Sequence, residues 1–148
     1  MITEVIIKRA VDGDDEAFKT LYEDLYKDMY RIAYYKLQNK EDAEDVVSDT
    51  VFDMYKGIHK LKDLSAYRAW AMKILNVKCG IKIKEYYINK TEDIEEYDCQ
   101  SSQNLETETV FRADVSQALN ILSEEEKTIV LCSAVAGMSS DEISEITS

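Results

Sequence analysis

The sequence predicts an all-α protein made of two small helical domains that an acidic linker joins. The 148 residues contain no proline and only four glycines, and 45% of them are apolar, which is enough for a core. Apolar side chains recur at three- and four-residue steps, as in helices with one buried face, whereas the alternation typical of strands is scarce. We expect domains at residues 1–88 and 109–148, with the linker at 89–108.

The same sequence indicates a cytoplasmic protein that is not an enzyme. The amino terminus lacks the apolar run of a signal peptide, and no stretch approaches the ~20 apolar residues that span a bilayer. Cys79, Cys99 and Cys132 form neither a metal-ligand cluster nor an even disulfide set, which indicates reduced thiols. The single histidine, His59, has no catalytic partner at a suitable spacing, and no phosphate-binding glycine loop is present. We therefore expect no cofactor and no bound metal.

Charge is segregated along the chain. Residues 1–55 carry 7 basic and 14 acidic side chains, and residues 91–148 carry 2 basic and 14 acidic ones. Residues 56–90 carry 9 basic and 2 acidic side chains, a net charge of +7 within a chain of net charge −12. Since phosphate contacts depend on the local charge, this basic segment is a candidate for nucleic-acid binding despite the acidic total. The alternative is that its lysines only solvate a helix.

The first domain is expected to begin with two helices. Thr3 is a suitable N-cap for a short helix that ends near Val11, and Gly13 separates it from the next helix. The second helix, about 14–37, has the strongest helical period of the chain. Its predicted core residues are Phe18, Leu21, Tyr22, Leu25, Met29, Ile32, Ala33 and Leu37. Residues 38–40 form the expected turn.

A third helix is predicted from Glu41 to about Gly57. Its buried side should consist of Ala43, Val46, Val47, Thr50, Val51 and Met54, and its opposite side of Asp42, Asp45, Asp49 and Asp53. The helix dipole favours acidic side chains in the first turn, which explains Asp42. Asp49 and Asp53 lie too deep in the helix for that explanation, so they are either solubilising or part of a docking surface.

The fourth helix is predicted at about 66–87, with Ser65 as its N-cap. Its expected buried residues are Tyr67, Trp70, Ala71, Ile74, Val77 and Ile81. Its expected exposed residues are Arg68, Lys73, Asn76, Lys78, Lys82 and Lys84. This helix therefore contains most of the basic segment.

The second domain follows an acidic, polar stretch without a sustained apolar period. One helix should bury Val110, Phe111, Val115, Ala118, Leu119 and Leu122, and the next Ile129, Val130, Cys132 and Val135. Ser123 with Glu126, and Ser139 with Glu142, have the spacing of capping boxes, and Gly137 lies between the two helices that they begin. Ile143 and Ile146 should anchor the last helix. This is the pattern at the front of a helix-turn-helix, truncated at Ser148, where a recognition helix should begin.

In order and spacing, these segments resemble bacterial RNA polymerase sigma factors of the sigma-70 family, extracytoplasmic-function group. GDDEAFKTLYEDLYKDMYRIAYYKL, EDAEDVVSDTVFDMYKGIHK and SAYRAWAMKIL resemble the first conserved domain of that group. ALNILSEEEKTIVLCSAVAGMSSDEISEI resembles the opening two-thirds of its second domain, without the last helix. The resemblance implies a non-enzymatic transcription initiation factor that binds core RNA polymerase, directs it to promoters, and recognises and helps melt the minus-ten element.

The resemblance also implies roles for individual residues. Polymerase binding, through the clamp helices of the largest subunit, falls to Asp42, Asp45 and Asp49. Promoter DNA binding falls to Lys60, Lys62, Arg68, Lys73, Asn76, Lys82 and Lys84. An anti-sigma factor is a further implied partner, and no membrane insertion is expected.

This chain also departs from the family. Val77 stands where many relatives have asparagine, and lysines replace an arginine-rich run, although lysine lacks the bidentate geometry of arginine. These departures favour an alternative: a sigma-like interaction protein that binds polymerase or an anti-sigma partner without recognising promoters.

Overall fold

The computed structural model describes residues 2–92 and 117–147, and every regular element in these ranges is helical. The α-helices are α1 (Glu4–Val11), α2 (Asp15–Leu37), α3 (Lys40–Gly57), α4 (Tyr67–Glu92), α6 (Glu124–Ala134) and α7 (Ser140–Thr147). Two short 3₁₀ turns, η1 (Ile58–Lys60) and η2 (Leu64–Ala66), connect α3 to α4. The predicted all-α class is thus confirmed for the described residues. None of their helices is long and apolar enough to cross a membrane.

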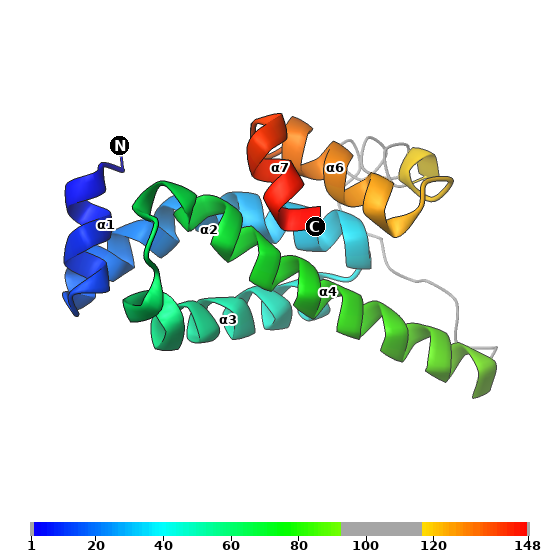
Figure 1. Ribbon diagram of the computed structural model, residues 1–148. Helices are drawn as coiled ribbons and strands as arrows, with labels where there is room; N and C mark the ends of the chain where they lie inside the picture. Colours follow the sequence, from blue (N-terminus) through cyan, green and yellow to red (C-terminus); the bar gives the residue numbers. More distant parts are fainter. Residues whose placement is uncertain (1, 93–116, 148) are drawn as a thin grey trace, which may run out of the picture.

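Helices α2, α3 and α4 pack against one another, and α1 packs against α2 (Figure 1). The carboxy-terminal pair α6–α7 lies on the opposite side of α2 and α4 from α3, with α7 against α4 and α6 against α2. Helix α4 is therefore enclosed on two sides, by α3 and by α7. Its last turns extend beyond the other helices (Figure 1).

Three of the predicted capping residues, Thr3, Ser123 and Ser139, cap their helices. The Thr3 hydroxyl accepts from the Ile6 amide, and Asp14 caps α2 by accepting from the Glu16 and Ala17 amides. The turn before α3 places Gln38 in the left-handed region at φ 55°, and the adjacent Asn39 caps α3. Both predicted capping boxes form, Ser123 with Glu126 and Ser139 with Glu142. Each supplies partners for amides that have none within their own helix.

The capping residue predicted for the start of α4, Ser65, is wrong. Asp63, not Ser65, accepts from the backbone at this point, and its Oδ1 also accepts from the Ser65 hydroxyl at 2.7 Å. Aspartate is at least as good a cap as serine, and here it begins a 3₁₀ turn that leads directly into α4. At its other end α4 runs to Glu92, past the predicted end at Tyr87. Most of the predicted linker lies outside the described residues. So do Val110, Phe111 and Val115, which were predicted to be buried in the first helix of the second domain.

The core is formed largely by the predicted side chains of α2 and α3. The exceptions are Tyr22 and Val51, which are only partly buried. Helix α1 adds Ile7 and Ala10 to this core, and Ile143 and Ile146 of α7 are buried as predicted. The first domain and the front of the second therefore have the expected inward faces in α2, α3 and α7.

The predicted faces of α4 and α6 need correction. Val77 and Ile81 are more than half exposed, while the buried face of α4 contains Ala69, Ala71, Met72, Leu75 and Cys79. Because α4 packs against both α3 and α7, its buried arc is wide and is rotated from the predicted one. On α6, Ile129 and Val130 are exposed and Thr128 and Leu131 are buried instead, while Cys132 is buried as predicted. Ala118, predicted to be buried, is exposed.

Candidate functional site

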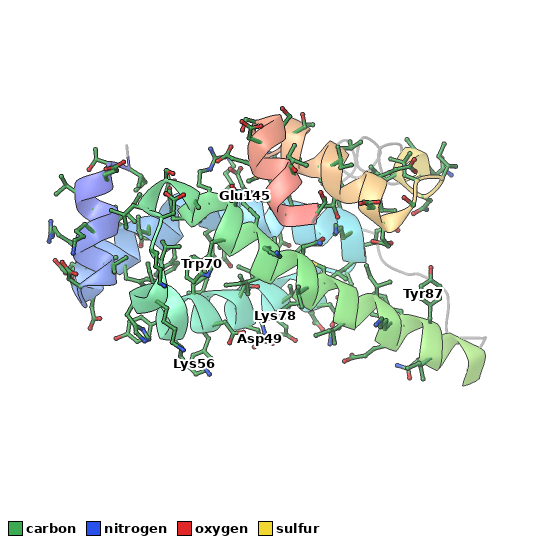
Figure 2. The ribbon with its side chains drawn as sticks, in the orientation of Figure 1. Asp49, Lys56, Trp70, Lys78, Tyr87 and Glu145 are labelled. Atoms are coloured by element: carbon green, nitrogen blue, oxygen red, sulfur yellow. The ribbon has the colours of Figure 1, made fainter. Side chains whose placement is uncertain are left out.

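The four aspartates of α3 do not form one free acidic surface. Asp45 and Asp49 are exposed, and their i, i+4 spacing places them on neighbouring turns of one helix face. Figure 2 shows Asp49 and Lys56 on the part of α3 that is remote from α6 and α7. We call the exposed side chains of Asp45, Asp49 and Phe52 the α3 outer face. This face has the exposure that a docking surface needs.

Asp42 and Asp53 instead join α3 to α4. The Tyr86 hydroxyl donates to the Asp42 carboxylate, and Lys82 Nζ lies 3.9 Å from the same group. Lys78 Nζ pairs with Asp53 at 2.9 Å, and this hydrogen bond lowers the pKa of the Asp53 carboxyl. Burial, together with the hydrogen bond to Asp42, raises the pKa of Tyr86, so the phenol stays protonated and able to donate. These two carboxylates therefore position α4.

An aromatic side chain completes the α3 outer face. Phe52 is 59% exposed, one turn beyond Asp49, and Lys56 Nζ lies 4.7 Å above its ring centre. Tyr55, beside it, packs edge-on against Phe18 and donates its hydroxyl to Asp15 at 2.9 Å. Sequence reasoning missed Phe52, although its position three residues after Asp49 in the helical period could have identified it.

The predicted DNA contacts fall into three groups. Lys60, Lys62, Lys73 and Lys84 are exposed and make no ion pair within the described residues. Lys82 is engaged by Asp42 and by Glu85 at 3.4 Å. Arg68 and Asn76 face the carboxy-terminal pair of helices. The four exposed lysines are therefore the predicted DNA contacts that remain accessible.

Arg68 and Asn76 contact α6–α7 directly. The Arg68 guanidinium donates to the carbonyl oxygen of Ala136, between α6 and α7. The Asn76 side-chain oxygen accepts from Lys36 Nζ of α2 and lies 3.0 Å from the Thr128 hydroxyl of α6. Lys36 Nζ also donates to that hydroxyl at 2.6 Å. Three helices thus meet at a cluster of Lys36, Asn76 and Thr128, which we call the lysine cluster.

Lys36 is the least expected member of this site. It is only 7% exposed, and burial lowers the pKa of its amine, because a charged ammonium is poorly solvated there. No carboxylate of the described residues lies within ion-pair distance of it, so neutral oxygens are its hydrogen-bond acceptors. Lysine is rarely buried without an acidic partner. The helical period could have identified Lys36, because it follows Leu25, Met29 and Ile32 at steps of three and four residues, unlike the exposed lysines of α2.

The described residues of this site show neither a metal-binding group nor a reactive thiol. In the described part of the chain, no group of three or more histidine, cysteine, aspartate or glutamate side chains could hold a metal ion. Cys79 and Cys132 are buried free thiols, and burial raises the pKa of Cys79 to about 11 and also raises that of Cys132. Both thiols are therefore protonated near neutral pH and poorly nucleophilic.

Comparison with known proteins identifies a segment that contains part of this site. Residues 21–79, from α2 into α4, match the family model Sigma-70 region 2. The match supports a sigma-factor role. It also bears out the prediction that the chain is not an enzyme, since sigma factors are non-enzymatic transcription initiation factors.

The fold of the chain is similar to a solved structure, that of CnrH in complex with the cytosolic domain of CnrY. The TM-score is 0.72 at 19% sequence identity, over 97% of this chain and 80% of the matched one. At this identity the similarity establishes the fold. No curated protein sequence matches the chain.

Proposed function

We propose that this protein is a sigma factor of the extracytoplasmic-function group, which binds core RNA polymerase and directs it to promoters. The observation that carries the proposal is the placement of two exposed surfaces of opposite charge within the Sigma-70 region 2 segment and its continuation along α4. One is the α3 outer face and the other is the set of exposed lysines. A chain with an acidic and a basic surface can bind a basic protein surface through the first and a polyanion through the second.

In this proposal, Asp45 and Asp49 bind the clamp helices of the largest polymerase subunit. Asp42 contributes less than its neighbours, because Tyr86 and Lys82 already engage it. Lys60, Lys62, Lys73 and Lys84 contact the phosphates of the minus-ten element, and Lys82 adds charge nearby. Phosphate contacts of this kind fix the position of DNA and do not by themselves select its sequence.

The proposal includes a two-domain layout and a protein partner. Helices α6 and α7 are the front of a second domain of helix-turn-helix type, and the acidic residues 89–108 connect it to the first. CnrH, which has a similar fold, is found in complex with the cytosolic domain of CnrY. By analogy, an anti-sigma factor holds this chain inactive in the cytoplasm until a signal releases it.

Co-elution with core polymerase in size-exclusion chromatography tests the proposal. The full chain should co-elute, and the double variant Asp45→Lys with Asp49→Lys should not, because both charges then repel a basic surface. The double variant Glu23→Lys with Glu145→Lys is the matched control, since it changes the net charge equally at exposed positions outside the α3 outer face. Equal co-elution of both double variants would contradict the docking assignment.

A second function, binding of polymerase or an anti-sigma factor without promoter recognition, is favoured by one observation. Arg68 and Asn76, two of the predicted DNA contacts, are engaged by α6–α7. Run-off transcription from a pool of genomic fragments of the source organism separates the two functions. Specific transcripts that require the protein support promoter recognition, and polymerase binding without transcripts supports the alternative.

A further inference from the structure

One side of α4 is left uncovered by the other helices of the described residues. Helix α4 packs against α2, α3 and α7, while Lys73, Val77, Ile81 and Lys84 are all exposed. At about 3.6 residues per turn, these four side chains project within about 80° of one another. Val77 and Ile81 are 56% and 54% exposed, although aliphatic side chains usually turn inward. We call these four exposed side chains the α4 outer face.

The α4 outer face has a lysine at each end and two aliphatic side chains between them. Lys73 and Lys84 make no ion pair within the described residues, and about 16 Å of helix separates them. Their charges are therefore available to a polyanion. Val77 and Ile81 lie about 6 Å apart along the helix axis, which is close to two base steps of DNA at about 3.4 Å each. The face thus combines two phosphate-binding positions with a short apolar contact.

Gly80 adjoins this face, and the fold does not require a glycine there. Its backbone is not in the left-handed region, and a Cβ placed on it would meet no atom of the described residues within 4 Å. Glycine in a helix interior is less stable than alanine, so it has a cost that packing does not explain. Gly80 lies one turn from both Val77 and Lys84, where it leaves a gap. Such a gap indicates the close approach of an external molecule.

We propose that the α4 outer face and Gly80 bind the major-groove edge of consecutive thymines, and that Val77 and Ile81 contact the thymine methyl groups. The inference rests on the proposed function and adds the base that α4 selects. An α-helix fits the major groove, where thymine presents its methyl group to apolar side chains. The last turns of α4 extend beyond the other helices, as entry into a groove requires (Figure 1). Lys73 and Lys84 hold the flanking phosphates.

Removal of the methyl groups from the DNA tests this contact without any change in the protein. One probe is a fluorescein-labelled duplex with a central run of A·T pairs, and the other has deoxyuridine in place of every thymidine. Fluorescence anisotropy of the full chain at low salt should give a Kd about fivefold higher for the uracil duplex, since burial of one methyl group changes an equilibrium constant about fourfold. Conversely, 5-methylcytosine in place of cytosine should lower the Kd of a G·C duplex.

The double variant Val77→Gln with Ile81→Gln removes the apolar contact from the protein. The ratio of the uracil Kd to the thymine Kd should then fall from about five to about one, because glutamine is suited to adenine and not to a methyl group. The matched control is Ile129→Gln with Val130→Gln, which replaces two exposed aliphatic side chains of α6 and should keep the wild-type ratio. Partial unfolding lowers both affinities equally, so it leaves this ratio unchanged.

The Gly80→Ala variant tests the close approach by effects of opposite sign. Alanine favours the helix, so the thermal midpoint should rise. The added methyl group occupies the gap, so the Kd for the thymine duplex should rise about fivefold. Gly57→Ala, at the end of α3, is the control and should leave this Kd unchanged. A loss of affinity in a stabilised protein cannot come from unfolding, whereas unchanged affinity in Gly80→Ala would overturn the close approach.

The outcomes distinguish this inference from the proposed function. Equal Kd values for the thymine and uracil duplexes in the wild type would overturn the inference, and would favour an acidic protein as the partner of the α4 outer face. An unchanged ratio in the Val77 and Ile81 double variant would overturn it as well. Binding of neither duplex by a chain that co-elutes with core polymerase would overturn it and leave polymerase docking intact. If the chain neither binds DNA nor co-elutes, the proposed function itself fails.

Discussion

The Tyr86 hydroxyl of α4 donates a hydrogen bond to the Asp42 carboxylate of α3, across 44 residues of sequence. Asp42 is thereby directed along the α3–α4 junction and away from the α3 outer face. An acidic residue that the family resemblance assigns to polymerase binding thus serves mainly to position α4.

The Tyr86→Phe variant should separate these two roles. Loss of a hydrogen bond to a charged group at a partly buried site should lower the free energy of unfolding by about 1–2 kcal/mol. Polymerase co-elution should stay unchanged, since Asp45 and Asp49 are untouched. Urea unfolding gives the first quantity and size-exclusion chromatography the second. Lost co-elution with an unchanged urea midpoint would mean that Asp42 and Tyr86 contact polymerase directly.

Phe52→Ala should weaken polymerase binding with little effect on folding. An exposed aromatic side chain beside two carboxylates is typical of an interface hot spot, so the Kd should rise about tenfold. Because the ring is mostly solvated, the thermal midpoint should change little. Tyr26→Ala, which removes an exposed aromatic residue of α2, is the control, and binding can be followed by fluorescence anisotropy. An equal loss in both variants would argue against a specific role for Phe52.

The double variant Lys73→Glu with Lys84→Glu should weaken DNA binding and leave polymerase binding intact. Each lost phosphate contact reduces the salt dependence of the DNA affinity, so the slope of log K against log salt should become less steep by about 2. Lys19→Glu with Lys27→Glu, at exposed positions of α2, controls for total charge. The same change of slope in the control would assign the effect to net charge alone.

Stability should fall between about pH 9 and pH 11. The Cys79 thiol has a folded-state pKa of about 11 against an ordinary value of 9.0, so the unfolded chain ionises first as the pH rises. The two-unit difference corresponds to about 3 kcal/mol of lost stability. Lys36 acts in the opposite direction, because its lowered pKa makes the folded state relatively more stable as its amine deprotonates.

Urea unfolding of the wild type and of Cys79→Ala across this range checks the prediction. The variant should start less stable, because it loses buried volume, and should then decline less steeply with pH. Parallel curves for the two proteins would assign the alkaline loss to the tyrosines or to Cys132, whose pKa values are also raised.

Sequence patterns predicted the buried residues wherever the apolar side chains of a helix repeat regularly at three- and four-residue steps. Helices α2 and α3 have such a repeat, and most of their buried residues agree with the prediction although each helix has several neighbours. Helix α4 packs against α2, α3 and α7, and its apolar residues occur on all its sides, so their period could not indicate which arc is buried. On α6, a hydrogen bond from Lys36 brings the polar Thr128 inward and leaves Ile129 exposed.

The candidate site was predictable only in part, for a similar reason. The exposure of Asp45, Asp49 and Lys73 follows from helix geometry within a single element. The partners of Asp42, Arg68 and Asn76 come from other helices, and no local pattern encodes them. Lys36 stands at a core position of the α2 period, but its acceptors, Asn76 and Thr128, come from two other helices.

The two ties between α3 and α4 have a mechanical consequence. Asp53, near the end of α3, is joined to Lys78 in the middle of α4, and Asp42, near the start of α3, is joined to Lys82 and Tyr86, one and two turns further along α4. Two separate contacts between antiparallel helices oppose both sliding and rotation of one helix against the other, whereas a single contact would still allow rotation about it. A tilt of α3 would therefore be transmitted to α4 and would move Lys73 and Lys84 with it.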